Sequence, residues 1–332
     1  MKKKLIGLVH NVPPPGAYSF SEASSDVMTQ VSAVEETLHN LGYASKRIPV
    51  SRNMDSFLAT FREEPIDMVF NLCETVDENP LFSGHAAAVL ELLGIPFTGS
   101  PSWAITYTMD KAMAKRILKA CGIRTPEYVT YDGSSQFDIS HLSFPVIVKP
   151  RFEGASIGID QESIFEHIDA LRKGLHSLYE RFGHLLVEEY LDGREFNVSL
   201  FGYPSADLMP IAEIDFSAFD DELYRIVGYR AKWDESSPEY RNAVRIFPQN
   251  IPSPLLQSLR TIAHECFHTF MLRDYARVDI RTDRHNNPCV LEINANPCIS
   301  PDAGFVASLE RAGINYTEMV RRFVDFMSLR LN

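Results

Sequence analysis

The sequence predicts an α/β protein whose first part is built around a parallel sheet. Over the first hundred residues, short apolar runs typical of strands alternate with helix-like stretches, which is the pattern of βαβ units. The chain has 332 residues, enough for about two domains or three small ones. Its longest apolar runs, at 5–9 and 86–90, fall far short of the ~20 residues of a membrane-spanning helix. A soluble protein is therefore expected.

The first part is predicted to hold strands at 5–9 and 66–72 and helices at 26–42 and 84–94. From Asp26 onwards, apolar residues recur three and four positions apart until Gly42, which marks the end of the first helix. Ligands of parallel sheets bind beyond the carboxyl ends of the strands. The segments after Val9 and after Leu72 are therefore expected near a site.

The second part is predicted to contain helices at about 110–121, 161–180 and 254–271, strands at 145–150, 184–191 and 194–202, a hairpin of strands 275–283 and 288–297, and two final helices. Residues 224–242 are polar, mixed and without periodicity. They are expected to form a long loop, and loops of that length in compact domains are usually functional or disordered.

Charge and cysteine content exclude several classes of protein. The 44 acidic against 32 basic residues give a net charge of −12, whereas general nucleic-acid binders need a basic surface. A few focused lysines could still hold a small phosphate-bearing ligand. Five cysteines without CxxC spacing argue against a disulfide framework or zinc knot and favour a reducing cytoplasm. The start, MKKKLIGLVHN, imitates a signal peptide, but its apolar stretch is too short.

The predicted hairpin carries the most informative polar residues. Glu292 and Asn294 lie two apart and therefore on one face of their strand, and a turn near 285–287 would bring Asp279 opposite or close to Glu292. Three such oxygen ligands suit Mg²⁺ that carries nucleotide phosphates. Two alternatives remain open: the residues form the polar face of a half-exposed sheet, or Asp279 forms a structural pair with Arg277.

Lysines and glutamates of the middle of the chain complete a candidate nucleotide site. Lys149 ends a predicted strand before the turn EGASIG, whose backbone amides could point at phosphate oxygens; the alternative is a solvated lysine. Lys111 sits near a helix start, where a positive charge is unfavourable. Glu188 and Tyr190 share one strand face and Glu189 lies on the other, so the backbone could recognise adenine, or the charges could keep an edge strand soluble.

The ordered set of motifs, rather than any single one, resembles the ATP-grasp superfamily and, within it, the D-alanine–D-alanine ligase family. The motifs follow one another as GIPFTGSP, MDKAMAKRIL, FPVIVKP with EGxSxG, EEYLDGREF, AKW, ARVDIRTD and LEINANP, and the resemblance covers essentially the whole chain. It implies an ATP-grasp fold of three α/β domains: a Rossmann-like domain at 1–105, a central one at 106–192, and a C-terminal one at 193–332 with a mobile loop at 224–242.

The resemblance also implies roles for individual residues. It places ATP phosphates at Lys111 and Lys149 with Ser156 capping them, adenine at Glu188, Glu189, Tyr190 and Leu191, the ribose at Glu195, and the γ-phosphate at Lys232. Two Mg²⁺ ions, with Mn²⁺ as an alternative, would be held by Asp279, Glu292 and Asn294. Arg277 would stabilise a tetrahedral intermediate.

The substrate half departs from the family pattern. The first loop contains three prolines, at 13–15, and offers only Glu22 as a substitute for the glutamate that receives the donor amine. The remaining departures are Asn71 at the place of a histidine, Ala155 in place of a first hydroxyl residue, Trp233 for a tyrosine, and Ala303 for the serine that receives the acceptor carboxylate. Such losses should strongly reject the original substrate.

These observations predict an ATP- and Mg²⁺-dependent carboxylate–amine ligase that acts on another amino acid or small peptide through an acyl phosphate. Two alternatives stay open: an authentic D-alanine–D-alanine ligase of cell-wall synthesis, and a non-catalytic ATP-binding regulatory protein. Retention of Lys232, Arg277 and the metal ligands argues against the last. The expected partners are small molecules, with no nucleic acid and no membrane; a homodimer and a cytoplasmic location are also expected.

Overall fold

A computed structural model describes residues 4–13, 20–134 and 138–331. Its first sheet is parallel and has the strand order β2-β1-β3, formed by β1 (Leu5–Asn11), β2 (Ala44–Val50) and β3 (Met68–Leu72). The predicted parallel sheet and both predicted strands are thus confirmed, and β2 is an additional strand that the sequence analysis missed. Its less regular apolar pattern explains the omission, since only Ile48 and Val50 of this strand are buried.

Four α-helices and one short 3-10 helix accompany this sheet: α1 (Ser21–Asn40), α2 (Met54–Glu63), η1 (Pro80–Phe82), α3 (Ser83–Leu93) and α4 (Ser102–Met109). Helix α1 begins five residues before the predicted start at Asp26. Its apolar stripe of Val27, Val31, Val34 and Leu38 is fully buried, as the spacing predicts. The periodic stripe therefore located the helix but not its first turn, which precedes the first apolar residue of the stripe.

The second sheet is antiparallel with the order β4-β7-β5-β6, from β4 (Tyr128–Tyr131), β5 (Val146–Pro150), β6 (Ile164–Phe165) and β7 (Leu185–Glu189). Helix α5 (Lys111–Ala120) precedes it and α6 (Ile168–Phe182) packs against it. The predicted helix at 161–180 is wrong in its first seven residues. Asp160 caps a single 3-10 turn, η2 (Gln161–Ser163), and Ile164 then pairs with Ile147 of β5.

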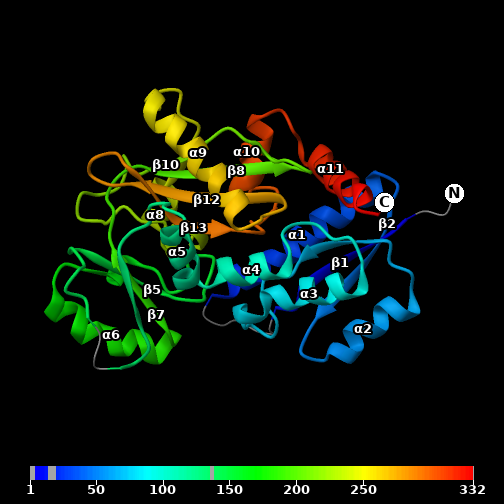
Figure 1. The fold of residues 1–332 in the computed structure, drawn as a ribbon, viewed down its shortest axis with the longest axis horizontal. Coiled ribbons are helices and arrows are strands. Elements are labelled where there is room, and N and C mark those ends of the chain that lie inside the picture. The colour runs from blue at the N-terminus through cyan, green and yellow to red at the C-terminus, as the bar shows by residue number, and fades with distance from the viewer. Residues whose placement is uncertain (1–3, 14–19, 135–137, 332) are drawn as a thin grey trace.

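The third sheet has the order β11-β10-β8-β12-β13, with β9 beside β8. Its strands are β8 (Glu195–Gly202), β9 (Asp207–Leu208), β10 (Ala212–Asp215), β11 (Val244–Ile246), β12 (Asp274–Thr282) and β13 (Pro288–Asn294). Helix α9 (Ser253–Thr269) covers one face, and α10 (Gly304–Arg311) and α11 (Tyr316–Leu329) pack on the other (Figure 1). The predicted hairpin and both final helices are confirmed. Each of the three sheets lies within one predicted span, while the domain boundaries themselves stay predictions.

The segment 224–242 differs from the long irregular loop that the sequence predicts. It contains two short helices, α7 (Tyr229–Trp233) and α8 (Pro238–Asn242). The second is started by Ser237, whose side chain accepts a hydrogen bond from the Tyr240 amide, and by Pro238 at its first position. Five residues are too few to show the periodicity by which helices are found in a sequence.

The two ends of the chain share one core. Apolar residues of α1, β1 and β3 pack with residues of α10 and α11, such as Phe70 against Phe323. Near the end of the chain, Arg330 binds the Asp274 carboxylate of β12 at 2.6 and 2.9 Å and donates to the Phe97 carbonyl at 2.7 Å. In the described part of the chain, no helix has both the length and the apolar character needed to cross a membrane.

Candidate active site

The hairpin of β12 and β13 has the register that the sequence predicts. Asp279 pairs with Glu292, and Arg277 pairs with Asn294, so the four polar residues occupy one patch of the sheet. An irregularity in the pairing directly follows Asp279. Bulges of this kind alter local twist and re-aim side chains, and they are frequent next to active sites.

The Asp279 carboxylate is held by three neighbouring side chains. Arg277 donates to both of its oxygens at 2.7 and 2.8 Å, Asn197 donates at 2.8 Å, and Asn294 donates at 3.0 Å. Burial would lower the pKa of Arg277, but Asp279 more than compensates, so this pKa is raised and the guanidinium is a permanent cation. The pair between Arg277 and Asp279 that the sequence analysis left as an alternative therefore exists.

The donor set of this patch fits Mg²⁺. Asp279 and Glu292 supply carboxylate oxygens, and Asn294 uses its amide nitrogen on Asp279, which leaves its carbonyl oxygen as a third ligand. No three His, Cys, Asp or Glu side chains converge as a metal site among the described residues. Phosphate or water oxygens would thus have to complete the coordination, as is usual for Mg²⁺ bound with a nucleotide.

Lys111 joins this metal patch to the turn EGASIG. Its ammonium lies 3.0 Å from a Glu292 oxygen and donates to the Glu153 carbonyl. Burial alone would raise the pKa of Glu292, but Lys111 and Lys149 outweigh it and keep this pKa low. The unfavourable position of Lys111 at the start of α5 is offset by Asp110, whose carboxylate caps the helix amides.

Glu188 lies between two lysines. Lys149 forms an ion pair with one oxygen of its carboxylate, and Lys115 of α5 lies 2.7 Å from the other. Burial would raise the pKa of Glu188, yet the two ammonium groups outweigh it and bring the pKa to about 2. The sequence analysis missed Lys115, although it follows Lys111 by four residues and therefore lies on the same helix face.

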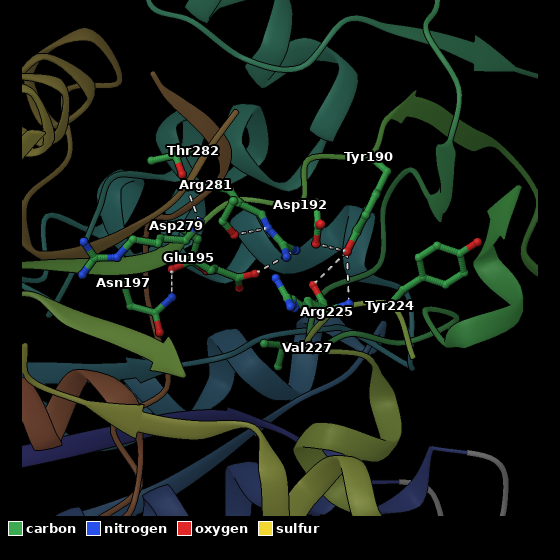
Figure 2. A network of polar contacts seen from close by, with 12 residues as sticks. Tyr190, Asp192, Glu195, Asn197, Tyr224, Arg225, Val227, Asp279, Arg281 and Thr282 are labelled. Carbon is green, nitrogen blue, oxygen red and sulfur yellow. Dashed lines mark hydrogen bonds and ion pairs between the residues drawn. The ribbon is translucent and has the colours of Figure 1, made fainter. Parts of the chain in front are cut away.

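Of the predicted adenine and ribose residues, Tyr190 and Glu195 lie beside Arg281 of β12 (Figure 2). The Arg281 guanidinium lies 3.3 Å from a Glu195 oxygen and 5.3 Å from the centre of the Tyr190 ring. The Tyr190 hydroxyl accepts a hydrogen bond from the Arg225 amide at 3.0 Å. Glu189 points to the other face, where it accepts from the Ser143 amide at 2.8 Å, and Leu191 is half-buried just after the strand.

Segment 224–242 lies against the turn EGASIG. Ser156 donates its hydroxyl to the Val227 carbonyl at 2.7 Å, and the Trp233 indole donates to the Ala155 carbonyl at 2.9 Å. Lys232 as a whole residue is exposed, but its ammonium group is partly desolvated by surrounding protein. This desolvation, followed by the charge of Arg277, lowers the pKa of Lys232. The structure therefore brings the loop lysine toward the metal patch.

The predicted substrate residues do not gather in one place. Glu22 accepts a hydrogen bond from the Tyr229 hydroxyl at 2.8 Å, at the base of α7. Asn71 is only 1% exposed within the first sheet, where its oxygen accepts from the Cys73 amide at 3.4 Å. Ala303 precedes α10 as its N-cap. Of the predicted proline-rich loop only Pro13 is described; the other two prolines lie outside the described residues.

A polar cluster that the sequence analysis missed lies between α1, β3 and the segment after β13. Asp26 accepts from the Ser300 hydroxyl at 2.8 Å and from the Cys298 thiol at 3.0 Å, and Gln30 donates to Glu74 at 2.9 Å. Burial raises the pKa of Glu74, with a smaller contribution from the charge of Asp26, while the hydrogen bond from Gln30 and the charge of Lys232 oppose this. Glu74 follows Leu72, so the expectation of a site beyond this strand pointed to it.

Arg245 of β11 lies on the C-terminal side of the same region. It contacts the Asp302 carbonyl at 3.4 Å, and its guanidinium lies over Gly304, the first residue of α10. Burial, followed by the charge of Arg277, lowers its pKa. Two neighbouring guanidinium groups beside the amide end of a helix favour a negatively charged ligand.

Comparison with known proteins agrees with this geometry. The family described as "D-ala D-ala ligase C-terminus" matches residues 117–325. A D-alanine–D-alanine ligase of Carboxydothermus hydrogenoformans is 30% identical over 302 residues, covering 88% of this chain and 90% of the relative. The uncharacterized protein y4sG of Sinorhizobium fredii is 32% identical over 260 residues, covering 78% and 74%.

Among solved structures, a D-alanine–D-alanine ligase from Bacillus anthracis complexed with ATP superimposes with a TM-score of 0.76 and 21% identity over 99% of both chains. The fold is therefore an ATP-grasp fold, the architecture of ATP-dependent ligases. The chain belongs to the D-alanine–D-alanine ligase family. The resemblance predicted from the ordered motifs is thus confirmed.

Proposed function

We propose that this protein is an ATP- and Mg²⁺-dependent carboxylate–amine ligase whose substrates are not two D-alanines. The observation that carries the proposal is the contrast around Lys232. On one side lie Arg277, Asp279 and Glu292 in an arrangement suited to nucleotide and metal. On the other side the polar contacts come chiefly from Asp26 and Glu74, while Ala155, Trp233 and Ala303 stand where the family pattern has hydroxyl-bearing residues.

The proposed reaction forms an acyl phosphate. A substrate carboxylate oxygen attacks the γ-phosphorus of ATP, the bond to the bridging oxygen breaks, and ADP leaves. An amine then attacks the acyl carbon, the tetrahedral intermediate collapses with release of phosphate, and the amine loses a proton. When bound by Asp279, Glu292 and Asn294, Mg²⁺ would neutralise phosphate charge. This route needs positioned charges rather than a nucleophilic Ser or Cys.

Each charged residue then has a defined task. Arg277 is held rigidly by Asp279 and stays protonated at all relevant pH values, which suits stabilisation of a developing oxyanion. Lys232 supplies charge to the transferred phosphoryl group. Because its pKa is lowered in the free protein, an arriving phosphate should raise it again and draw the α7 segment onto the nucleotide.

The charged residues of the substrate half favour a ligand with a positive and a negative end. Asp26 and Glu74 offer carboxylates to an ammonium group. Arg245 and the first amides of α10 offer donors to a carboxylate. The Trp233 indole already donates to Ala155, so its hydrogen bond is used to fix the segment and not the substrate.

The deciding experiment measures ADP release with D-alanine and with a panel of L- and D-amino acids and dipeptides. Each lost hydrogen bond to a charged group is worth roughly 1.5–3 kcal/mol, so the loss of two should reduce D-alanine turnover by orders of magnitude. We expect background release with D-alanine and clear stimulation by another substrate. Efficient D-alanyl-D-alanine synthesis would instead support an authentic D-alanine–D-alanine ligase. ATP binding without turnover across the panel would support a regulatory protein.

A further inference from the structure

Helix α5 carries a buried lysine to which the proposed mechanism gives no task. Lys115 is 1% exposed, and lysine is almost never fully buried unless paired. Its ammonium lies 2.7 Å from a Glu188 oxygen and donates to the Thr125 hydroxyl at 2.7 Å. It also faces the Tyr128 ring at 5.8 Å. Its two polar partners, Glu188 and Thr125, are themselves buried, so the ammonium is engaged in contacts inside the protein.

The charges around Glu188 do not cancel. One carboxylate is shared by the ammonium groups of Lys115 and Lys149, so the three side chains together carry one positive charge. Glu188 is 1% exposed, whereas Lys149 is the member of the three that reaches partly toward solvent. The surplus charge is therefore presented at Lys149, the residue predicted to meet phosphate.

Without Lys115 the net charge around Glu188 would be different. Glu188 would have Lys149 as its one counter-ion in this triad, and a paired, buried ammonium offers little net charge to an incoming anion. We propose that Lys115 is a positioning residue for nucleotide binding, which neutralises Glu188 so that Lys149 keeps its charge for an ATP phosphate. This inference rests on the proposed function, because it assumes that Lys149 meets the nucleotide.

The same lysine is tied to the metal-binding strand. Thr125, which accepts from Lys115, donates its hydroxyl to the Val290 carbonyl at 2.8 Å, and the Val290 amide donates to the Arg124 carbonyl at 2.8 Å. Val290 lies on β13, two residues before Glu292. The contacts of Lys115 thereby fix the position of Lys149 relative to the metal ligands, which a nucleotide spanning both must match.

The test compares ATP binding by the unmodified chain, Lys115→Met and Lys119→Met, measured by titration calorimetry with Mg²⁺ and without any amino-acid substrate. Lys119 is the matched control, because it lies one turn further along α5, is exposed, and pairs with Glu127. Loss of a buried charge partner should weaken ATP binding about tenfold or more in Lys115→Met, as is usual for buried charged pairs. Lys119→Met should bind like the unmodified chain.

A charge-balance rescue separates this role from simple packing. The double variant Lys115→Met with Glu188→Gln again leaves Lys149 with one uncompensated charge and buries no unpaired ion, so it should fold. It also keeps the backbone at residue 188, which is the part of that residue expected to recognise adenine, because the carboxylate itself faces the two lysines. We expect its ATP dissociation constant to return most of the way to that of the unmodified chain. A purely structural lysine predicts that the double variant binds no better than Lys115→Met, and that result would overturn the proposal.

Two further outcomes bear on the inference separately from the ligase proposal. Unchanged ATP affinity in Lys115→Met would overturn the inference even if the protein proves to be a ligase. An unmodified chain that binds ATP but releases no ADP with any substrate would refute the ligase and leave the rescue experiment valid. Absence of ATP binding by the unmodified chain would overturn both.

Discussion

The nucleotide and substrate halves of the candidate active site differ in how their charges are balanced. In the nucleotide half these carboxylates form ion pairs. Arg277 pairs with Asp279, Lys111 pairs with Glu292, and two lysines share Glu188. In the substrate half, Asp26 and Glu74 contact neutral groups of Gln30, Cys298 and Ser300, and neither forms an ion pair with any described residue. The carboxylates of the nucleotide half are therefore paired with cations before a ligand binds. Asp26 and Glu74 in the substrate half have no such pair, and the ammonium group of a substrate could supply the cation.

The largest expected effect tests the nucleotide half. Replacing Asp279 by Ala should abolish ADP release, because it removes a metal ligand and frees Arg277 from its partner. It should also lower stability by about 3–5 kcal/mol, the usual cost of breaking a largely buried pair. Activity is measured by ADP release in excess Mg²⁺ and stability by urea unfolding.

Asp279→Asn is the matched control for stability. It keeps the shape of the side chain and one oxygen that can accept from Arg277, but the Arg277 charge stays uncompensated, so only part of the stability should return while ADP release stays absent. Normal ADP release by either variant would remove Asp279 from the metal site.

A smaller effect, on the KM of one substrate only, tests the substrate half. Glu74→Gln should raise KM for the amine-bearing substrate roughly 10- to 150-fold, since a hydrogen bond to a charged group contributes roughly 1.5–3 kcal/mol. The KM for ATP should not change. Glu36→Gln, an exposed neutralisation on α1, is the matched control. Equal changes in both KM values would show that Glu74 acts through the fold and not on the substrate.

The pH dependence of the affinity for this substrate has a predictable sign. Burial outweighs the hydrogen bond from Gln30 and raises the pKa of Glu74, so its carboxylate takes up a proton at a higher pH than an ordinary glutamate. Affinity for an ammonium-bearing substrate should therefore fall as the pH drops through that raised pKa, and this acidic limb should be absent in Glu74→Gln.

The smallest expected effect concerns the segment 224–242, which lies against the turn EGASIG of the nucleotide half. Trp233→Phe removes one neutral hydrogen bond to Ala155, worth about 0.5–1.5 kcal/mol, so limited proteolysis within the segment should be roughly 2- to 12-fold faster. Trp103→Phe on α4, at the chain's other tryptophan, is the control. A non-hydrolysable ATP analogue should slow the cleavage, and equal rates with and without it would argue against a lid.

The two halves also differ in what the sequence could predict. The metal patch could be predicted from the sequence because a short turn joins the strands of Asp279 and Glu292. Strand alternation then determines which side chains share a face. The cluster around Asp26 could not be predicted, because its partner Cys298 lies 272 residues away and only the tertiary fold brings α1 to the segment after β13. Local pattern cannot reveal such a contact.

Two other differences have local causes. The start of α6 was missed because Asp160 caps a competing 3-10 turn, which interrupts an otherwise helical pattern. Lys115 was missed because a lysine on a helix is normally solvated, and its burial depends on Glu188 from a strand 73 residues further along. In both cases the deciding contact is invisible to periodicity.

The shared core of the two chain ends has a consequence for biosynthesis. The sheet of β1, β2 and β3 is translated first, but the apolar face of α1 and β3 is completed by α10 and α11, and Arg330 secures Asp274 from the far end. On the ribosome the first third must therefore wait, with part of its apolar surface uncovered, until almost the whole chain has emerged. A nascent chain arrested before residue 304 should accordingly engage chaperones, and release from them should coincide with the arrival of the last two helices.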